Sequence, residues 1–225
     1  MIIGGKDLLN GKRFDKGGYI LTYDYDKWSF IDPKEAQKKL NLPRNPRDYT
    51  SIAVTTDDSN DEIVYASSMG DGVIQYKNGT PVQSYNEKNA FKETAGGYGS
   101  GYCYIDGLAF DKNGNLWMTS SEVNHAVLVL DKAGAWHRLD IEQLRGVYTI
   151  NDILITSTND KWIYVPRNTP KLVMIPNSES LDEVSSYEFT TLIDTDGKEL
   201  TPSNYTCVAE DKDGYIWVGT NRVAV

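Results

Sequence analysis

The sequence has few of the residues that most often carry chemistry. Among 225 residues it contains two cysteines, Cys103 and Cys207, and two histidines, His125 and His137. Neither histidine lies in an HExxH, HxH or Cys/His cluster, so we expect no metal site and no cofactor. The segment 99–101 (GSG) lacks the spacing of a nucleophile elbow, and no strand-turn-helix pattern surrounds it. The sequence therefore predicts no catalytic residues and a protein that is not an enzyme.

Long apolar runs and basic runs are also absent. No stretch approaches the roughly 18 apolar residues of a membrane-spanning helix, so we expect no membrane insertion by this segment. Lys and Arg number 23 against 32 Asp and Glu, a net charge of −9, which disfavours nucleic acid as a partner. Because Met1 opens directly into a strand pattern, we interpret the segment as a piece of a longer chain whose targeting information lies upstream.

What the sequence does have is a repeat. Residues 205–220 (YTCVAEDKDGYIWVGT) have a near-copy at 105–120 (IDGLAFDKNGNLWMTS), and fainter copies lie at 150–165 and 52–67. Each copy is an alternating apolar run, a turn and a second apolar run. Alternation indicates a strand with one buried face, and Asn-Gly or Asp-Gly supplies the positive φ that a tight hairpin needs. The repeat therefore predicts antiparallel hairpins.

The spacing of the repeat predicts the architecture. The aligned second strands carry Tyr65, Trp117, Trp162 and Trp217, which lie 45 to 55 residues apart. A step near this length suits a four-stranded propeller blade of about 40–50 residues. Third and fourth apolar runs follow each second strand, at 72–76 and 81–85, at 126–130 and 135–139, and at 171–175 and 187–192.

The fold class we expect is all-β, a partial β-propeller of about four to five four-stranded antiparallel blades within one region, 1–225. In the first blade, residues 2–5, 18–23 and 27–31 fit strands two to four. The predicted divisions are a part-blade at 1–48, blades at 49–100, 101–147 and 148–203, and a part-blade at 204–225. Both part-blades would supply a second strand, so together they cannot complete one ordinary four-stranded blade. The ring is therefore expected to be an excerpt of a larger propeller.

One helix is expected, in the connection between the first two blades. Residues 33–43 (PKEAQKKLNLP) are bounded by prolines and place Ala36 and Leu40 on one side. Such connections emerge on the same face of a propeller as the loops between second and third strands. Variable chemistry is therefore expected on that face.

Tryptophans and cysteines have structural interpretations. Trp117, Trp162 and Trp217 repeat in phase, which favours packing between blades over stacking on a ligand. Cys103 and Cys207 open first strands two blades apart, too far for the Cα spacing of about 5.5 Å in a disulfide. We expect both cysteines to be buried as small apolar residues.

The turns at 111–114 (DKNG) and 211–214 (DKDG) begin with the acidic residues of a calcium loop but do not have its glycine at the sixth position. They are therefore predicted to be hairpin turns.

A candidate ligand site follows from the phase of the loops. The segments 69–71, 121–125, 167–170 and 220–222 fall at one phase, and 96–104 adds tyrosines to the same edge. Exposed tyrosines there, including Tyr104, can stack on sugar rings or grip a peptide, and arginine can meet an anionic sugar or phosphate. The alternative is that these are ordinary solvated loops. The candidate ligand-binding residues are Tyr98, Tyr102, Asn124, His125, Arg167 and Asn168.

At VAEDKDGYIWVGT, residues 208–220, the chain resembles the two-component-regulator propeller repeat almost residue for residue, and the copy at Asp111 matches well. Residues 105–225 are also similar to the propeller region of PorZ-type proteins of Bacteroidetes. Those proteins pair such propellers with a small C-terminal β-domain and are associated with type IX secretion and anionic lipopolysaccharide.

The resemblance implies a non-catalytic binding or scaffold module in the periplasm or at the cell surface. Implied partners are a glycan or lipopolysaccharide, proteins of a secretion or sensor complex, and the remainder of the same chain. The alternative is the periplasmic sensor region of a hybrid two-component system that recognises glycan fragments. Residues beyond Val225 would discriminate between them, a transmembrane helix and kinase indicating the sensor.

Overall fold

The computed structural model describes residues 2–3, 5, 12–91, 101–220 and 223–224. The chain divides into two compact units, Met1–Phe110 and Asp111–Val225, called unit 1 and unit 2. The boundary falls in the turn after β8, inside the segment 101–147 that the sequence assigns to one blade.

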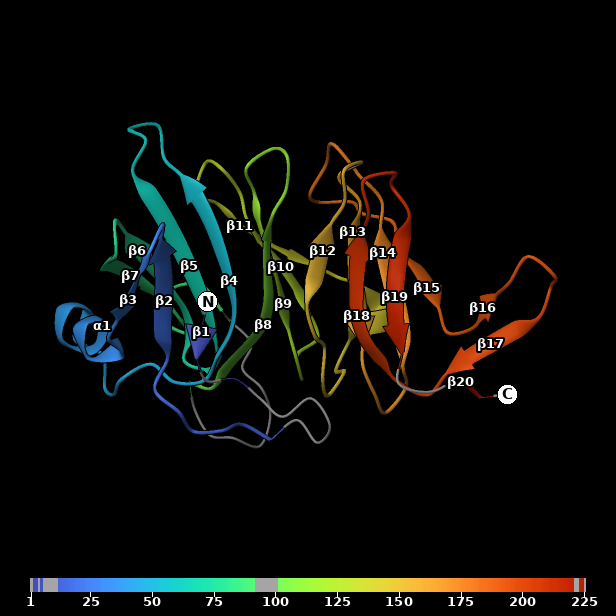
Figure 1. Ribbon diagram of the computed structural model, residues 1–225, viewed down its shortest axis with the longest axis horizontal. Helices are drawn as coiled ribbons and strands as arrows, with labels where there is room; N and C mark the ends of the chain where they lie inside the picture. The colour runs from blue at the N-terminus through green and yellow to red at the C-terminus, as the bar shows by residue number, and fades with distance from the viewer. Residues whose placement is uncertain (1, 4, 6–11, 92–100, 221–222, 225) are drawn as a thin grey trace. The chain divides into compact units, whose positions relative to one another are not determined.

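Unit 1 contains two antiparallel sheets (Figure 1). The first has the order β1-β2-β3, with β1 at Ile2–Ile3, β2 at Tyr19–Asp24 and β3 at Lys27–Ile31. The second has the order β4-β5-β6-β7, with β4 at Tyr49–Thr56, β5 at Glu62–Gly70, β6 at Gly72–Lys77 and β7 at Thr80–Tyr85. The end of β5 also pairs with the start of β8, Cys103–Phe110.

The predicted helix is present as α1, Pro33–Leu40. The Asp32 side chain caps it by accepting from the Lys34 amide at 2.9 Å, and Pro33 starts the first turn, where no amide donor is needed. Asn41 ends it in the left-handed conformation at φ 51°. Ala36 is fully buried and packs in one cluster with Ile20 of β2 and with β4 to β6. The helix therefore joins the two sheets of unit 1.

Unit 2 contains the later strands. Its first antiparallel run has β9 at Leu116–Ser120, β10 at Val127–Leu130 and β11 at Trp136–Leu139, followed by the 3-10 helix η1 at Glu142–Leu144. A four-stranded sheet has β12 at Ile153–Ile155, β13 at Lys161–Val165, β14 at Lys171–Ile175 and β15 at Tyr187–Phe189. Smaller sheets join β16, Leu192–Ile193, to β17, Glu199–Pro202, and β20, Val223–Ala224, and pair β18, Tyr205–Glu210, with β19, Ile216–Thr220.

The all-β prediction is confirmed. Every strand pair resolved in register among the described residues is antiparallel, and β4–β7 and β12–β15 each comprise four strands paired in sequence order. Helix is limited there to α1 and η1. The sequence did not predict β17, which lies in a segment assigned to a connection between blades.

The repeated turns share one geometry. Asp111 Oδ1 accepts from the amides of Asn113 and Asn115, and Gly114 lies at φ 84° and donates to the Asp111 carbonyl. The fainter copies place Asn60 and Asn159 at the glycine position, with φ 62° and 69°. Asparagine tolerates this left-handed conformation better than most residues. The hairpin-turn interpretation is therefore confirmed, and it extends to copies without glycine.

The tryptophans depart from the expectation at one position. Trp117 is 1% exposed, and Trp162 is partly buried and stacks on Phe189 with ring centroids 5.6 Å apart. Trp217 is 65% exposed, so its predicted packing between blades is wrong for this structure. Its sheet, β18–β19, presents that face to solvent, whereas Trp117 lies beneath Lys161 of β13, whose Nζ is 4.5 Å from the ring centroid.

The cysteines are both free, but only one is buried. Cys103 is 1% exposed, and desolvation, with the Glu87 carboxylate adding, raises the pKa of its thiol to about 12. Cys207 is exposed because it lies on the same open face of β18–β19 as Trp217. The predicted burial is thus confirmed for Cys103 and wrong for Cys207.

Candidate functional site

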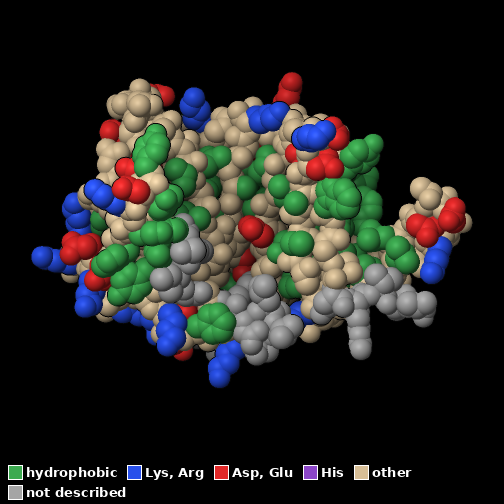
Figure 2. Space-filling view, viewed as in Figure 1, with side chains coloured by type: hydrophobic (Ala, Val, Ile, Leu, Met, Phe, Trp, Pro, Cys, Tyr) green, Lys and Arg blue, Asp and Glu red, His purple; other side chains and the backbone are tan. Residues whose placement is uncertain are grey.

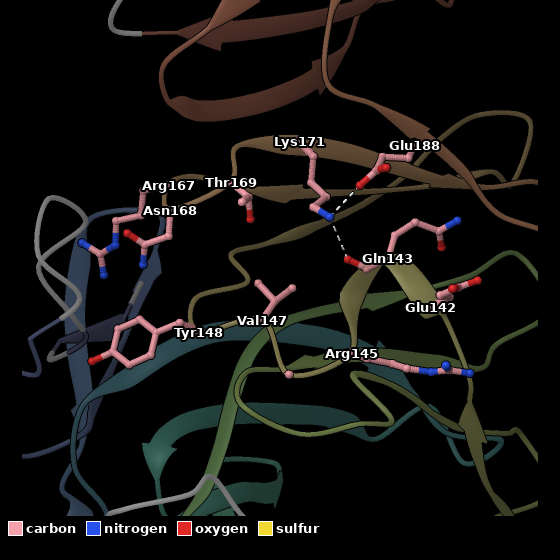
Figure 3. A pocket seen from close by; sticks show the side chains of 11 residues that line it. Glu142, Gln143, Arg145, Val147, Tyr148, Arg167, Asn168, Thr169, Lys171 and Glu188 are labelled. Atoms are coloured by element: carbon pink, nitrogen blue, oxygen red, sulfur yellow. Dashed lines mark hydrogen bonds and ion pairs between the residues drawn. The ribbon is translucent and has the colours of Figure 1, made fainter.

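A polar pocket of about 590 Å³ opens in unit 2 between two loops (Figure 3). One loop follows η1, and the other joins β13 to β14. The first is a connection between blades and the second joins a second strand to a third strand. The sequence predicts variable chemistry on loops of both kinds. The residues that line the pocket are Glu142, Gln143, Arg145, Gly146, Val147, Tyr148, Arg167, Asn168, Thr169, Lys171 and Glu188.

Backbone hydrogen bonds hold the first loop against its neighbour. The Glu122 amide donates to the Val147 carbonyl at 2.8 Å, and the Gly146 amide donates to the Val123 carbonyl at 2.9 Å. Gly146 adopts φ 64°, a left-handed turn that glycine allows at no steric cost. The second loop turns at Asn168, with φ 65°. Both sides of the pocket are therefore fixed by backbone geometry.

One wall of the pocket is an ion pair. The Lys171 ammonium lies 2.5 Å from a Glu188 carboxylate oxygen and donates to the Gln143 carbonyl at 3.0 Å (Figure 3). The Lys171 side chain is only 14% exposed, so its charge is partly removed from water and needs these partners. Lys171 therefore links β14, β15 and η1 and positions this wall.

Arg145, which also lines the pocket, is paired with Asp140. Its guanidinium donates from Nε at 2.7 Å and from Nη2 at 2.5 Å to the two oxygens of the Asp140 carboxylate. This bidentate geometry is the strong form of an arginine–carboxylate pair. Arg145, with a smaller contribution from His125, keeps the pKa of Asp140 below its ordinary value of 3.8.

The Arg145→Gln variant is expected to raise the pKa of Asp140 toward 3.8, because the hydrogen-bonding cation is removed. A carboxyl group whose pKa is depressed by folding stabilises the protein above its unfolded pKa, and this contribution is lost as pH falls through the folded pKa. Between roughly pH 5 and pH 2, the variant should therefore lose less free energy of unfolding than the wild type does. NMR titration of the Asp140 carboxyl carbon measures this, and an unchanged pKa would contradict the pairing.

The other end of the pocket carries a cation, an amide and an aromatic ring. Arg167, Asn168 and Tyr148 lie together at one end of the pocket (Figure 3). The Arg167 guanidinium donates to the Thr149 hydroxyl at 3.2 Å, and the Tyr148 ring is 48% exposed. A guanidinium, an amide and a half-exposed aromatic ring converge here, a combination that can bind an anion and stack on a ring.

The predicted ligand-binding residues separate in the structure. Arg167 and Asn168 line the pocket. Asn124 and His125 lie on the β9–β10 loop, which hydrogen-bonds the first pocket loop, but they do not line the pocket. Tyr98 lies outside the described residues.

The expectation of exposed tyrosines before β8 is wrong for two of them. Tyr102 and Tyr104 are 6% and 2% exposed and pack with Met69 in unit 1. Their rings meet edge to face at 6.4 Å, and the Arg13 guanidinium lies 5.9 Å from the Tyr102 ring centroid. β8 is buried on both sides from Cys103 to Leu108, and Tyr102 lies directly before it, so neither tyrosine is placed to stack on a ligand.

Tyr148, Lys171 and Glu188 are among the pocket residues that the sequence prediction missed. Tyr148 lies two residues after the connection 142–146 recognised in the sequence, and its position beside Gly146 on a surface loop was the available signal. Lys171 and Glu188 sit in strands and gave no signal, because their contact requires the pairing of β14 with β15.

The described residues include no group of three His, Cys, Asp or Glu side chains that could hold a metal ion. His137 of β11 instead hydrogen-bonds Asp131, in the turn before that strand, at 3.0 Å and does not line the pocket. Among the helices that the structure describes, none has the length and apolar character to cross a membrane.

Comparison with known proteins agrees with this architecture. Residues 199–222 match the family described as the two component regulator propeller. Comparison with curated protein sequences finds no significant match. PorZ from Porphyromonas gingivalis, described as an essential bacterial surface component of the type-IX secretion system, is 21% identical with a TM-score of 0.77 over 92% of this chain and 28% of its own.

Two extracellular domains from B. thetaiotaomicron, described as parts of hybrid two component systems, are also similar. One is 16% identical with a TM-score of 0.51, covering 91% of this chain and 30% of its own, and the other is 14% identical with a TM-score of 0.50, covering 97% and 25%. The chain thus spans less than a third of each of these three structures. It carries a two-component-regulator propeller repeat and has the fold of a β-propeller with four-stranded antiparallel blades.

Proposed function

We propose that this chain is a non-catalytic propeller module that binds a polar, anionic ligand of the glycan or lipopolysaccharide class in the pocket of unit 2. The observation that carries the proposal is the convergence of Arg167, Asn168 and Tyr148 at one end of the pocket, whose other end holds the internally neutralised Lys171–Glu188 pair. The pocket offers cationic, amide and aromatic groups to one molecule.

The chemistry of the walls supports this ligand class. Arg167 lines the pocket beside Asn168 and Tyr148, so its guanidinium is placed to meet a ligand charge. Its guanidinium can bind a carboxylate or phosphate with two parallel hydrogen bonds. Tyr148 can stack on the apolar face of a sugar ring, and Asn168 can exchange hydrogen bonds with hydroxyl groups.

The setting we propose is the periplasm or the cell surface of a Bacteroidetes cell, within a type IX secretion-associated assembly. The support is the likeness to PorZ, itself a surface component, together with a β-propeller scaffold that positions loops for binding. Protein partners in such an assembly are part of the proposal.

A sensor role is the second candidate. The two extracellular domains from B. thetaiotaomicron favour it, since they are described as parts of hybrid two component systems. In that case the same pocket would recognise a glycan fragment, and the ligand would be a short oligosaccharide rather than lipopolysaccharide.

Arg167→Ala is expected to weaken binding of an anionic oligosaccharide by about 10- to 100-fold, because a hydrogen bond to a charged group contributes about 1.5–3 kcal/mol. Tyr148→Ala should weaken it less, and Lys212→Ala, which removes an 87%-exposed lysine outside the pocket, should leave it unchanged. Calorimetry with acidic and neutral oligosaccharides of equal length, and with purified lipopolysaccharide, measures these effects.

The outcomes separate the alternatives. Binding of lipopolysaccharide but not of short acidic oligosaccharides favours the secretion role, and the reverse favours the sensor role. Equal affinity of the wild type and Arg167→Ala for every acidic ligand would remove this pocket as the site. Release of a shorter sugar by the wild type would overturn the non-catalytic assignment.

A further inference from the structure

The pocket of unit 2 carries different charges at its two ends. Its charged lining residues are Glu142, Arg145, Arg167, Lys171 and Glu188. Arg167 lies at one end with Asn168 and Tyr148, whereas the other four charged residues lie toward the opposite end (Figure 3). Because both ends belong to one cavity of about 590 Å³, a single ligand can contact both.

The end away from Arg167 has more carboxylates than Lys and Arg cations. The Lys171 ammonium lies 2.5 Å from a Glu188 carboxylate oxygen, and the Arg145 guanidinium forms its bidentate pair with Asp140. Each of these two cations is therefore matched by one carboxylate. Glu142 is a third carboxylate at this end, and no ion pair joins it to either cation.

Glu142 carries its carboxylate on a backbone segment that is held in place. It begins η1, and no described residue makes a hydrogen bond or an ion pair with its carboxylate. The next residue, Gln143, is anchored twice, since its carbonyl accepts from Lys171 at 3.0 Å and its side-chain oxygen accepts from the Ser186 hydroxyl at 2.9 Å. The Glu142 carboxylate is therefore available to a ligand at a defined position in the pocket.

The groups between the two charges suit a saccharide. Val147 and Thr169 lie between the two ends, and Asn168 and the half-exposed Tyr148 ring stand beside Arg167 (Figure 3). A hydroxyl and an amide can exchange hydrogen bonds with sugar hydroxyl groups, and an aromatic ring can stack on the apolar face of a sugar. A sugar chain can therefore lie along the pocket with one charged group at each end.

We propose that the ligand of this pocket is a zwitterionic saccharide, an acidic sugar chain that also carries an unacetylated amino group. Its carboxylate or phosphate binds Arg167, as in the proposed function on which this inference rests. Its ammonium group donates charge-assisted hydrogen bonds to Glu142. An N-acetyl group has no positive charge and cannot replace this contact, so Glu142 determines whether the pocket distinguishes an amino sugar from its acetylated form.

A matched pair of probes tests the contact with the amino group. A hyaluronan hexasaccharide and its N-deacetylated form have the same length and the same carboxylates and differ only in their amino groups. In calorimetry at a pH at which these amines are protonated, the N-deacetylated form should bind at least about tenfold more tightly, the effect of one hydrogen bond between charged groups. Glu142→Gln keeps the size of the side chain and removes its charge, so it should abolish this preference and leave the affinity for the acetylated form unchanged.

Charged side chains of both signs are spread over the face of the molecule that Figure 2 shows, so a change in net charge needs its own control. Glu35→Gln removes the same charge from α1 in unit 1, outside the pocket, and should keep the wild-type preference. Glu142→Lys should reverse the preference, because a cation at this position repels the ammonium group of the deacetylated sugar.

The outcomes separate this inference from the proposed function. Arg167→Ala should weaken binding of both forms, because both carry the carboxylates. Equal affinity of the wild type for the two forms, or a preference that survives in Glu142→Gln, would overturn the amino-group contact and leave the anionic site standing. Failure of both forms to bind would remove the proposed function and this inference with it. Tighter binding of a short zwitterionic peptide than of the deacetylated sugar would assign the pocket to a peptide instead.

Discussion

Replacement of Asp111 by alanine is expected to lower the free energy of unfolding of unit 2 by about 3–5 kcal/mol, the cost of breaking a buried charged network. The Asp111 carboxylate is 7% exposed and accepts four hydrogen bonds, from the amides of Asn113 and Asn115, the Asn115 side chain and the Trp117 indole. The variant leaves these donors buried and removes the negative charge near Lys161, a lysine that is itself 2% exposed.

The second copy of the motif provides the matched control. Asp211 accepts the equivalent bonds from Asp213, Tyr215 and the Trp217 indole, but this turn is exposed, so water can replace the carboxylate. Asp211→Ala should therefore have a much smaller effect. Hydrogen exchange on the full chain measures both variants, and equal losses of protection would show that burial does not decide the cost.

Replacement of Gly72 by alanine is expected to destabilise unit 1 by about 3–4 kcal/mol. Gly72 opens β6 at φ 78°, a conformation that costs other residues about 1–2 kcal/mol. A Cβ atom there would also lie 2.1 Å from the Tyr85 carbonyl oxygen, which is backbone and cannot rotate away. The β6–β7 pairing would have to shift.

Gly79 separates the two contributions. It has a similar φ of 73°, but the nearest atom to its added Cβ is the end of the Ile31 side chain at 3.9 Å. Gly79→Ala should cost only the conformational part, about 1 kcal/mol. Urea unfolding of the full chain measures both, and equal midpoints for the two variants would refute the steric explanation.

The strands were predictable because the same pattern of apolar run, turn and apolar run recurs at several positions in the sequence. The turn in the weakest copies was recognisable only by phase, since Asn60 and Asn159 replace glycine at the left-handed position. The sequence also placed the helix correctly within 33–43, because the bounding prolines and the Ala36–Leu40 spacing agree, and the observed helix ends at Leu40.

Burial was the feature that the sequence could not supply. Trp117 and Trp217 occupy equivalent positions, yet one is covered by a following sheet and the other is open to solvent. In the same way, the sequence placed Tyr102 in an exposed loop. In the structure it packs with Met69 and Tyr104 in the interior of unit 1. Whether a side chain reaches solvent depends on its tertiary neighbours, which local pattern does not encode.

The pocket was predicted in part for a related reason. Arg167 was found because loops between second and third strands recur at one phase. Lys171 and Glu188 lie within strands, and only the β14–β15 register brings them into contact. Phase therefore locates the edge of the propeller that carries a site, whereas the walls of the site come from pairing.

The most direct test of the proposed binding function is an NMR titration of the full chain with an acidic oligosaccharide. We predict shifts at the Arg167 guanidinium, the Tyr148 ring and the Gly146 amide, with Lys212 unchanged and the signals of the sugar constant over hours. Shifts confined to other surfaces, or new signals from a cleaved sugar, would contradict a non-catalytic binding site in this pocket.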